Sequence, residues 1–191
     1  MKKKDIPNAI SMMRIILVIP IVYFLLRGQY NVSLILFLVA GLSDALDGFL
    51  AKRYQWVSRL GSFLDPLADK LLLLSCFTAC AYLELMPLWL LVLVISRDLF
   101  VAMGAFLYHY FIEGFKGDPP FSSKLNTLVQ IVYLLMLISS QGLILIPLSW
   151  VELVLYAVLA TTSVSGLEYV WVWGMRAWNI REKRRYDHQH K

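Results

Sequence analysis

The organisation of this chain is clearest in residues 43–70, which read SDALDGFLAKRYQWVSRLGSFLDPLADK. Two apolar segments are joined here by a short basic connection, and each segment carries two aspartates close to that connection. Asp44 and Asp47 are three residues apart, so they share one face of a helix. Asp65 and Asp69 are four residues apart and share a face in the same way. Because a short connection makes two helices antiparallel, the four carboxylates lie at a similar depth and can converge on one point.

The rest of the chain is too apolar for a soluble domain. Of its 191 residues 59% are hydrophobic, and the mean hydropathy is +0.65, whereas soluble domains are about half apolar. Turn signals such as Arg27-Gly28-Gln29 and Met86-Pro87 separate the apolar runs. The runs cover residues 10–26, 32–50, 65–85, 88–112, 125–148 and 151–175. We therefore expect an all-α polytopic membrane protein with six transmembrane helices, forming a single integral-membrane domain over residues 1–191.

Lysine and arginine residues predict the orientation, because they collect in the cytoplasmic loops of membrane proteins. If the lysines at positions 2–4 are cytoplasmic, the basic connection at 52–59 and the basic tail at 181–185 are cytoplasmic too. Both termini and the aspartates then face the cytoplasm, and we expect a protein of the bacterial inner membrane, surrounded by its lipids. Since the charges lie between apolar runs and form no basic face, no nucleic-acid partner is expected.

The four aspartates predict a metal site. Four ionised carboxylates in a medium of low dielectric constant need a counter-charge, because the burial of one anion costs on the order of several kcal/mol of free energy. Oxygen ligands alone favour Mg²⁺ or Mn²⁺ over zinc, and two ions are expected. The alternative is that the aspartates pair with cations of the same stretch. Those cations are Lys52, Arg53, Arg59 and Lys70.

The pattern Asp44-x2-Asp47-Gly48-x2-Ala51-Lys52-x8-Gly61-x3-Asp65-x3-Asp69 resembles the signature of the CDP-alcohol phosphotransferase family. The resemblance implies that all four aspartates bind or adjoin the metal ions and that Asp69 is the catalytic base. The residues that it implies for CDP binding are Asn8, Asp47, Gly48, Ala51, Lys52, Arg53 and Gly61. The family has arginine where this chain has Lys52, so either Lys52 or Arg53 contacts the nucleotide. Family members form homodimers, and a homodimer is expected here.

Three cations at membrane depth are candidates for binding the acceptor: Arg14, Arg97 and Lys124. Each is costly in a bilayer unless it is paired or functional. If they point into one cavity, they form an anion site for a phosphorylated alcohol. Alternatively, Arg97 pairs with a carboxylate such as Glu168, since Asp98 is expected to face another direction, and Lys124 only extends to the interface.

The resemblance also implies the substrates. The opening Ile6-Pro7-Asn8 and the closing Ser165-Gly166-Leu167 are similar to the phosphatidylglycerophosphate synthase branch. That branch transfers a phosphatidyl group from CDP-diacylglycerol to glycerol 3-phosphate, releasing CMP, and this is the expected reaction. Ser123-Lys124-Leu125-Asn126-Thr127 is also similar to the single-site cardiolipin synthases, whose acceptor is phosphatidylglycerol.

A membrane transporter is the alternative from a different class, because charges within a membrane can line an ion path. Inverted repeats or helices broken at mid-membrane would indicate a transporter, and the sequence shows neither. The carboxylates also gather near one surface. The sequence therefore favours an enzyme.

Overall fold

The computed structural model describes the backbone of residues 6–54, 61–111, 121–142 and 146–189, and all regular secondary structure within these ranges is α-helix. Side chains are described for residues 9–44, 46, 54, 64–104, 121–142 and 146–171. The helices are α1 (Ile6–Leu26), α2 (Tyr30–Tyr54), α3 (Gly61–Tyr82), α4 (Leu88–Phe111), α5 (Phe121–Ser140) and α6 (Leu148–Gln189). The all-α prediction is thus confirmed for the described residues.

The predicted turns lie between helices. Gly28 follows α1 with a φ of 71°, a left-handed conformation that glycine adopts without steric cost. Glu84, with a φ of 58°, helps to reverse the chain before Met86-Pro87. These two reversals make α1 antiparallel to α2 and α3 antiparallel to α4.

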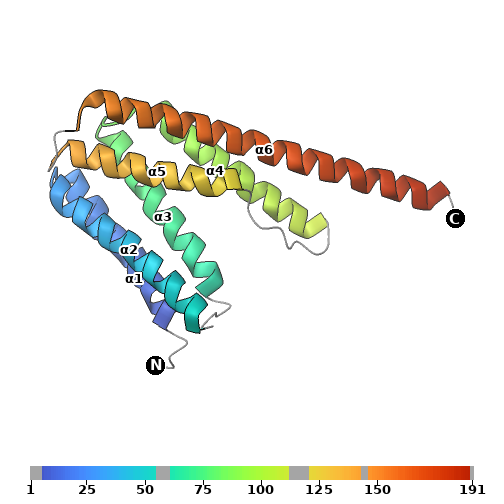
Figure 1. The fold of residues 1–191 in the computed structure, drawn as a ribbon, viewed down its shortest axis with the longest axis horizontal. Helices are drawn as coiled ribbons and strands as arrows, with labels where there is room; N and C mark the ends of the chain where they lie inside the picture. The colour runs from blue at the N-terminus through green and yellow to red at the C-terminus, as the bar shows by residue number, and fades with distance from the viewer. Residues whose placement is uncertain (1–5, 55–60, 112–120, 143–145, 190–191) are drawn as a thin grey trace.

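Two predicted boundaries are wrong. The fifth apolar run was expected to reach residue 148, but α5 ends at Ser140, and Gln141 and Gly142 form a turn bonded back to Ile138 and Ser139. The stretch Ser139-Ser140-Gln141-Gly142 interrupts the apolar run with polar residues and a glycine, so the sequence carries a signal for this turn. The last helix was expected to end near residue 175, but α6 continues to Gln189 because its charged tail consists mainly of good helix formers. Figure 1 shows α6 running past the ends of the other helices.

Three helices have described residues that are long and apolar enough to span a membrane. The segments are Ala9–Leu26, Phe121–Ser140 and Leu148–Trp171, and Tyr30–Asp44 in α2 is a shorter apolar segment. Large apolar side chains such as Ile19, Leu42 and Leu128 point outward on several helices. The apolar helices indicate a membrane protein, and the six-span arrangement and the orientation of the termini stay predictions.

The helices pack as two groups that meet at α3 and α5. In one group α1 lies against both α2 and α3, and in the other α6 lies against both α4 and α5 (Figure 1). The Phe77 ring of α3 stacks on the Tyr133 ring of α5, with 6.1 Å between centroids. Cys76 and Cys80 are buried free thiols in this core. The packing brings the first half of α1, the second half of α2 and the first half of α3 together, where Asp44, Asp65 and Asp69 lie.

Candidate active site

One guanidinium nitrogen joins two of the predicted aspartates. Arg14 Nη1 of α1 lies 2.7 Å from Asp44 Oδ1 of α2 and 2.5 Å from Asp69 Oδ1 of α3. The Arg14 side chain is 0% exposed, whereas those of Asp44 and Asp69 are 43% and 41% exposed. The two carboxylates therefore converge from different helices, as predicted, and keep an open side.

The third described aspartate is bound by the same helix. Ser11 Oγ donates a hydrogen bond to Asp65 Oδ1, and Ser11 precedes Arg14 by three residues, so both point from one face of α1. Ser11 and Arg14 are each fully buried. Asp47 belongs to α2, but its side chain lies outside the described residues. Ser11 is not among the predicted site residues, although its spacing of three residues from Arg14 places both on one helix face.

A cavity of about 340 Å³ opens beside these carboxylates. Arg14, Asp44 and Asp69 line its polar end. The remaining lining residues come from α2, α3 and α5 and are mostly apolar: Phe37, Leu38, Ala40, Gly41, Leu42, Leu72, Leu73, Thr127, Ile131 and Leu135. A cavity with a charged end and an apolar body suits an amphipathic ligand such as a lipid with a polar headgroup.

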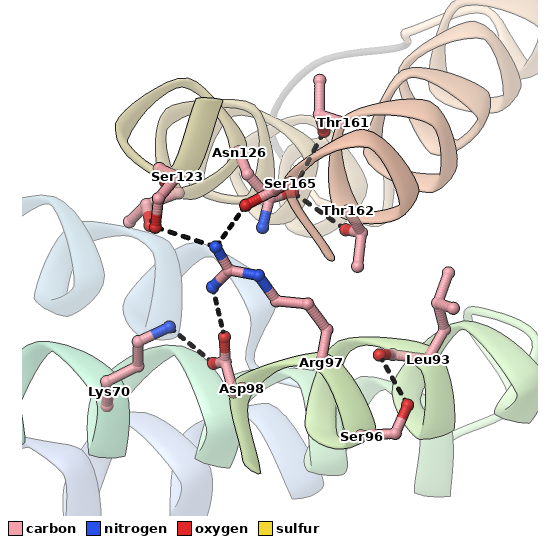
Figure 2. Close-up of polar contacts among 11 residues, drawn as sticks. Lys70, Leu93, Ser96, Arg97, Asp98, Ser123, Asn126, Thr161, Thr162 and Ser165 are labelled. Atoms are coloured by element: carbon pink, nitrogen blue, oxygen red, sulfur yellow. Dashed lines mark hydrogen bonds and ion pairs between the residues drawn. The ribbon is translucent and has the colours of Figure 1, made fainter. Parts of the chain in front are cut away.

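A second polar cluster surrounds Arg97 of α4, and Figure 2 shows its side chain reaching across to α5 and α6. Arg97 Nη2 donates to Ser123 Oγ at 2.8 Å and to Ser165 Oγ at 2.5 Å. Its Nη1 donates to Asp98 Oδ1 at 2.8 Å, and Lys70 Nζ of α3 donates to Asp98 Oδ2 at 2.5 Å. The expectation that Asp98 faces away from Arg97 is wrong, because the long arginine side chain folds back to its neighbour.

The Arg97 cluster lines a cavity of its own, with a volume of about 390 Å³. Five of its lining residues are polar or charged and five are apolar: Lys70, Arg97, Asp98, Ser123 and Thr127, with Leu74, Ile95, Leu99, Val101 and Ala102. Thr127 lines both this cavity and the aspartate cavity, so the two adjoin at α5.

The three predicted acceptor cations lie in three different settings. Arg14 belongs to the aspartate cavity, Arg97 to the adjoining one, and Lys124 is exposed on α5. Described contacts of Arg97 are to Asp98, the two serines and the Tyr169 ring, whose centroid is 5.7 Å away. The second cluster thus places Arg97, paired with Asp98, beside the cavity that adjoins the aspartate cavity.

Deeper between α5 and α6 lies a polar contact that the sequence pattern did not reveal. Asn126 Oδ1 accepts hydrogen bonds from Thr161 Oγ1 at 3.0 Å and from Thr162 Oγ1 at 2.9 Å (Figure 2). Asn126 and Thr162 are almost completely buried. This contact fixes the register of α5 against α6, and with it the positions of Ser123 and Ser165 one turn away.

Comparison with known protein families decides between the enzyme and transporter interpretations. The sequence model of CDP-alcohol phosphatidyltransferase matches residues 4–173. The chain belongs to the CDP-alcohol phosphatidyltransferase family.

Relatives within this phosphatidyltransferase family carry two different names. A cardiolipin synthase (CMP-forming) of Rattus norvegicus is 38% identical over 143 residues, which are 66% of this chain and 47% of the relative. CDP-diacylglycerol–glycerol-3-phosphate 3-phosphatidyltransferases are 37% identical in Aquifex aeolicus, over 65% of this chain and 70% of the relative, and 29% identical in Bacillus subtilis, over 86% and 93%. The chain spans about half the length of the animal cardiolipin synthases that it matches.

The oxygen atoms that the phosphatidyltransferase site offers as metal ligands fit a divalent cation. Asp44 and Asp69 present partly exposed carboxylate oxygens to one cavity, and hard cations such as Mg²⁺ prefer such ligands. Among the residues that the structure describes, no group of three or more potential ligands is assembled. The two carboxylates that do meet share Arg14 as their counter-charge in the metal-free protein.

The structure does not describe the side chains of the residues that the family signature predicts to bind the nucleotide. Gly48, Ala51, Lys52 and Arg53 belong to the last two turns of α2, Gly61 begins α3, and Asn8 lies in the first turn of α1. Their backbones therefore end or begin helices near Asp44 and Asp65 in the chain, and their contacts with CDP stay predictions.

Proposed function

We propose that this chain transfers a phosphatidyl group from CDP-diacylglycerol to a glycerol hydroxyl and releases CMP, and that the reaction depends on Mg²⁺. The observation that carries the proposal is the meeting of Asp44 and Asp69 at the polar end of an otherwise apolar cavity. A lipid diphosphate needs such a combination, with charge at one end and apolar walls along the rest. Family membership supports the same reaction class.

The aspartates divide the chemistry between them. We assign Asp44, Asp47 and Asp65 to holding two Mg²⁺ ions, with Asp69 adjacent to them. Divalent cations, when bound there, supply positive charge that offsets the charge of the diphosphate. Asp69 accepts the proton of the acceptor hydroxyl as that oxygen forms its bond to the phosphorus of the phosphatidyl group. The bond from that phosphorus to the CMP oxygen breaks, and CMP leaves.

The acceptor that the geometry supports best is phosphatidylglycerol. Lys70 and Arg97 bring two positive charges to the second cavity and Asp98 brings one negative charge, so the net charge of one matches a phosphodiester. A phosphomonoester carries about −1.5 to −2 at neutral pH. The apolar half of that lining suits acyl chains, and several relatives are named cardiolipin synthases.

Glycerol 3-phosphate, which the sequence favours, is the second candidate. The chain covers 93% of a Bacillus subtilis relative named for that acceptor. The exposed Lys124 lies next to Ser123 in the lining and could add positive charge when a ligand is present. Arg14 is bound to the aspartates and can influence either acceptor through them.

We place the enzyme in a bacterial inner membrane as a homodimer with six spans, both termini and the aspartates facing the cytoplasm. The apolar outward side chains of the described helices support the membrane location. The positive-inside distribution of the sequence supports the orientation.

The test is an assay of purified protein in detergent micelles containing CDP-diacylglycerol and Mg²⁺, with phosphatidylglycerol and glycerol 3-phosphate supplied separately. We expect CMP release with phosphatidylglycerol, with cardiolipin as the lipid product. Release with glycerol 3-phosphate alone, yielding phosphatidylglycerophosphate, would select the second candidate. Release with neither acceptor would overturn the proposed function.

A further inference from the structure

Arg14 has a position that acceptor binding does not explain. A single nitrogen of its guanidinium contacts carboxylates from two helices, and its side chain is completely buried behind them. The carboxylates in turn are about two-fifths exposed and line the cavity together with Arg14. A ligand entering the cavity can therefore contact the carboxylates from their open side while Arg14 holds them from α1.

The charge of this arginine is permanent. A guanidinium is not deprotonated in proteins, so α1 always contributes one positive charge at this point. Asp44 and Asp69 repel one another when both are ionised, and the shared guanidinium offsets that repulsion. Without a counter-charge, neither the carboxylate pair nor the buried arginine is stable in a medium of low dielectric constant.

We propose that Arg14 is a resident counter-ion, which holds Asp44 and Asp69 together when no divalent cation is bound and competes with that cation for both carboxylates. The inference rests on the proposed function, since it concerns the same carboxylates, and it adds a positioning role for a residue of α1. Ser11 supports the arrangement by holding Asp65 from the same face of α1.

Competition has two opposite consequences. The guanidinium stabilises the metal-free protein, so its removal lowers the unfolding temperature in a chelator. The guanidinium also repels an incoming cation across a short distance. Two unit charges about 4 Å apart near a protein surface change an equilibrium constant by more than tenfold. Removal of the guanidinium therefore raises the metal affinity by about tenfold or more. An acceptor-binding arginine would have neither effect.

The experiment compares Arg14→Gln with the wild-type protein and with Arg27→Gln, which removes an exposed arginine that follows the same helix. Mn²⁺ binding is measured by electron paramagnetic resonance, and thermal unfolding is measured in a chelator and in saturating Mg²⁺. We expect Arg14→Gln to bind Mn²⁺ about tenfold more tightly than the wild type, to unfold at a lower temperature in chelator, and to recover in Mg²⁺. Arg27→Gln should match the wild type throughout.

Equal or weaker Mn²⁺ binding by Arg14→Gln would overturn the inference. If Arg14→Gln does not fold even in Mg²⁺, Arg14→Lys carries the test, because it keeps the charge but loses the fork. Arg14→Lys should bind Mn²⁺ within about threefold of the wild type, since the repulsion is kept, and a loss of binding beyond tenfold would contradict competition. Failure of the proposed function is distinguishable, because Mn²⁺ would then bind the wild type no more tightly than it binds Asp44→Asn.

Discussion

Lys70 Nζ donates a hydrogen bond of 2.5 Å to Asp98 Oδ2 and so joins α3 to α4 one residue beyond Asp69. The other oxygen of Asp98 accepts from Arg97. One carboxylate therefore positions both cations of the second cavity, next to the residue that we assign as the base. This relationship connects the acceptor side of the site to its catalytic side.

Among the described residues, the Asp98 carboxylate is the only anionic partner of Arg97, so we expect Asp98→Asn to be destabilising. Arg97 is buried and would lose its counter-charge. The free energy of unfolding should fall by about 1.5–3 kcal/mol, the usual contribution of hydrogen bonds to charged groups. Thermal unfolding in detergent measures this, with Asp98→Glu as the control that keeps the charge. Unchanged stability of Asp98→Asn would mean that the pair contributes nothing.

Arg97→Ala should separate acceptor binding from donor binding. We expect KM for the acceptor to rise by about tenfold to a hundredfold, since a hydrogen bond to a charged group contributes about 1.5–3 kcal/mol. KM for CDP-diacylglycerol should stay close to the wild-type value, because Arg97 lines the other cavity. Steady-state kinetics with each substrate varied in turn measure both values, and Arg27→Ala is the matched cation control. Equal changes in the two KM values would assign Arg97 a structural role.

A larger side chain at Gly41 would fill the aspartate cavity, where we place the donor lipid, without disturbing the fold. Gly41 lines that cavity, and a Cβ atom built on it meets no other atom within 4 Å. Gly41→Leu should therefore fold, with a helix stabilised by up to about 1 kcal/mol, but should lower kcat/KM for CDP-diacylglycerol. Gly41→Ala, which adds only the Cβ atom, should keep most of the activity. Full activity of Gly41→Leu would show that the donor lipid lies elsewhere.

Asn126 tests whether the α5–α6 register matters for the site. Asn126→Ala removes the acceptor for Thr162, and side-chain hydrogen bonds between membrane helices contribute about 0.5–2 kcal/mol. We expect a loss of stability of that size, measured by thermal unfolding, with the exposed Gln141→Ala as the neutral comparison. Arg97 depends on Ser123 and Ser165 from the same two helices, so acceptor KM should rise as well. Unaltered stability would make Asn126 dispensable.

The sequence alone could predict the number of helices and the convergence of Asp44 with Asp69. It could also predict the turns at Gly28 and before Pro87. Apolar periodicity, glycine and carboxylate spacing are local signals, and antiparallel packing of neighbouring helices converts them into positions. The predicted fifth run extended past the end of α5 because apolar residues resume after the turn, although Ser139-Ser140-Gln141-Gly142 marks that turn with polar residues and a glycine.

Long-range partners were the part that sequence could not supply. Arg14 meets Asp69 across 55 positions of the chain, and Arg97 meets Ser165 across 68. Their pairing depends on how α1 packs on α3 and how α4 packs on α6, which no local pattern encodes. The sequence identified each cation as costly in a membrane, yet only the packing shows that Arg14 and Arg97 serve different cavities.

The central claim, that Asp69 serves a phosphatidyl transfer at the aspartate cavity, is tested most directly by CMP release from CDP-diacylglycerol with Mg²⁺ and acceptor present. We predict that Asp69→Asn lowers the rate by about a hundredfold or more, the usual contribution of a general base, while its elution volume and metal-bound unfolding temperature stay close to those of the wild type. Wild-type rates of CMP release by folded Asp69→Asn would contradict the account.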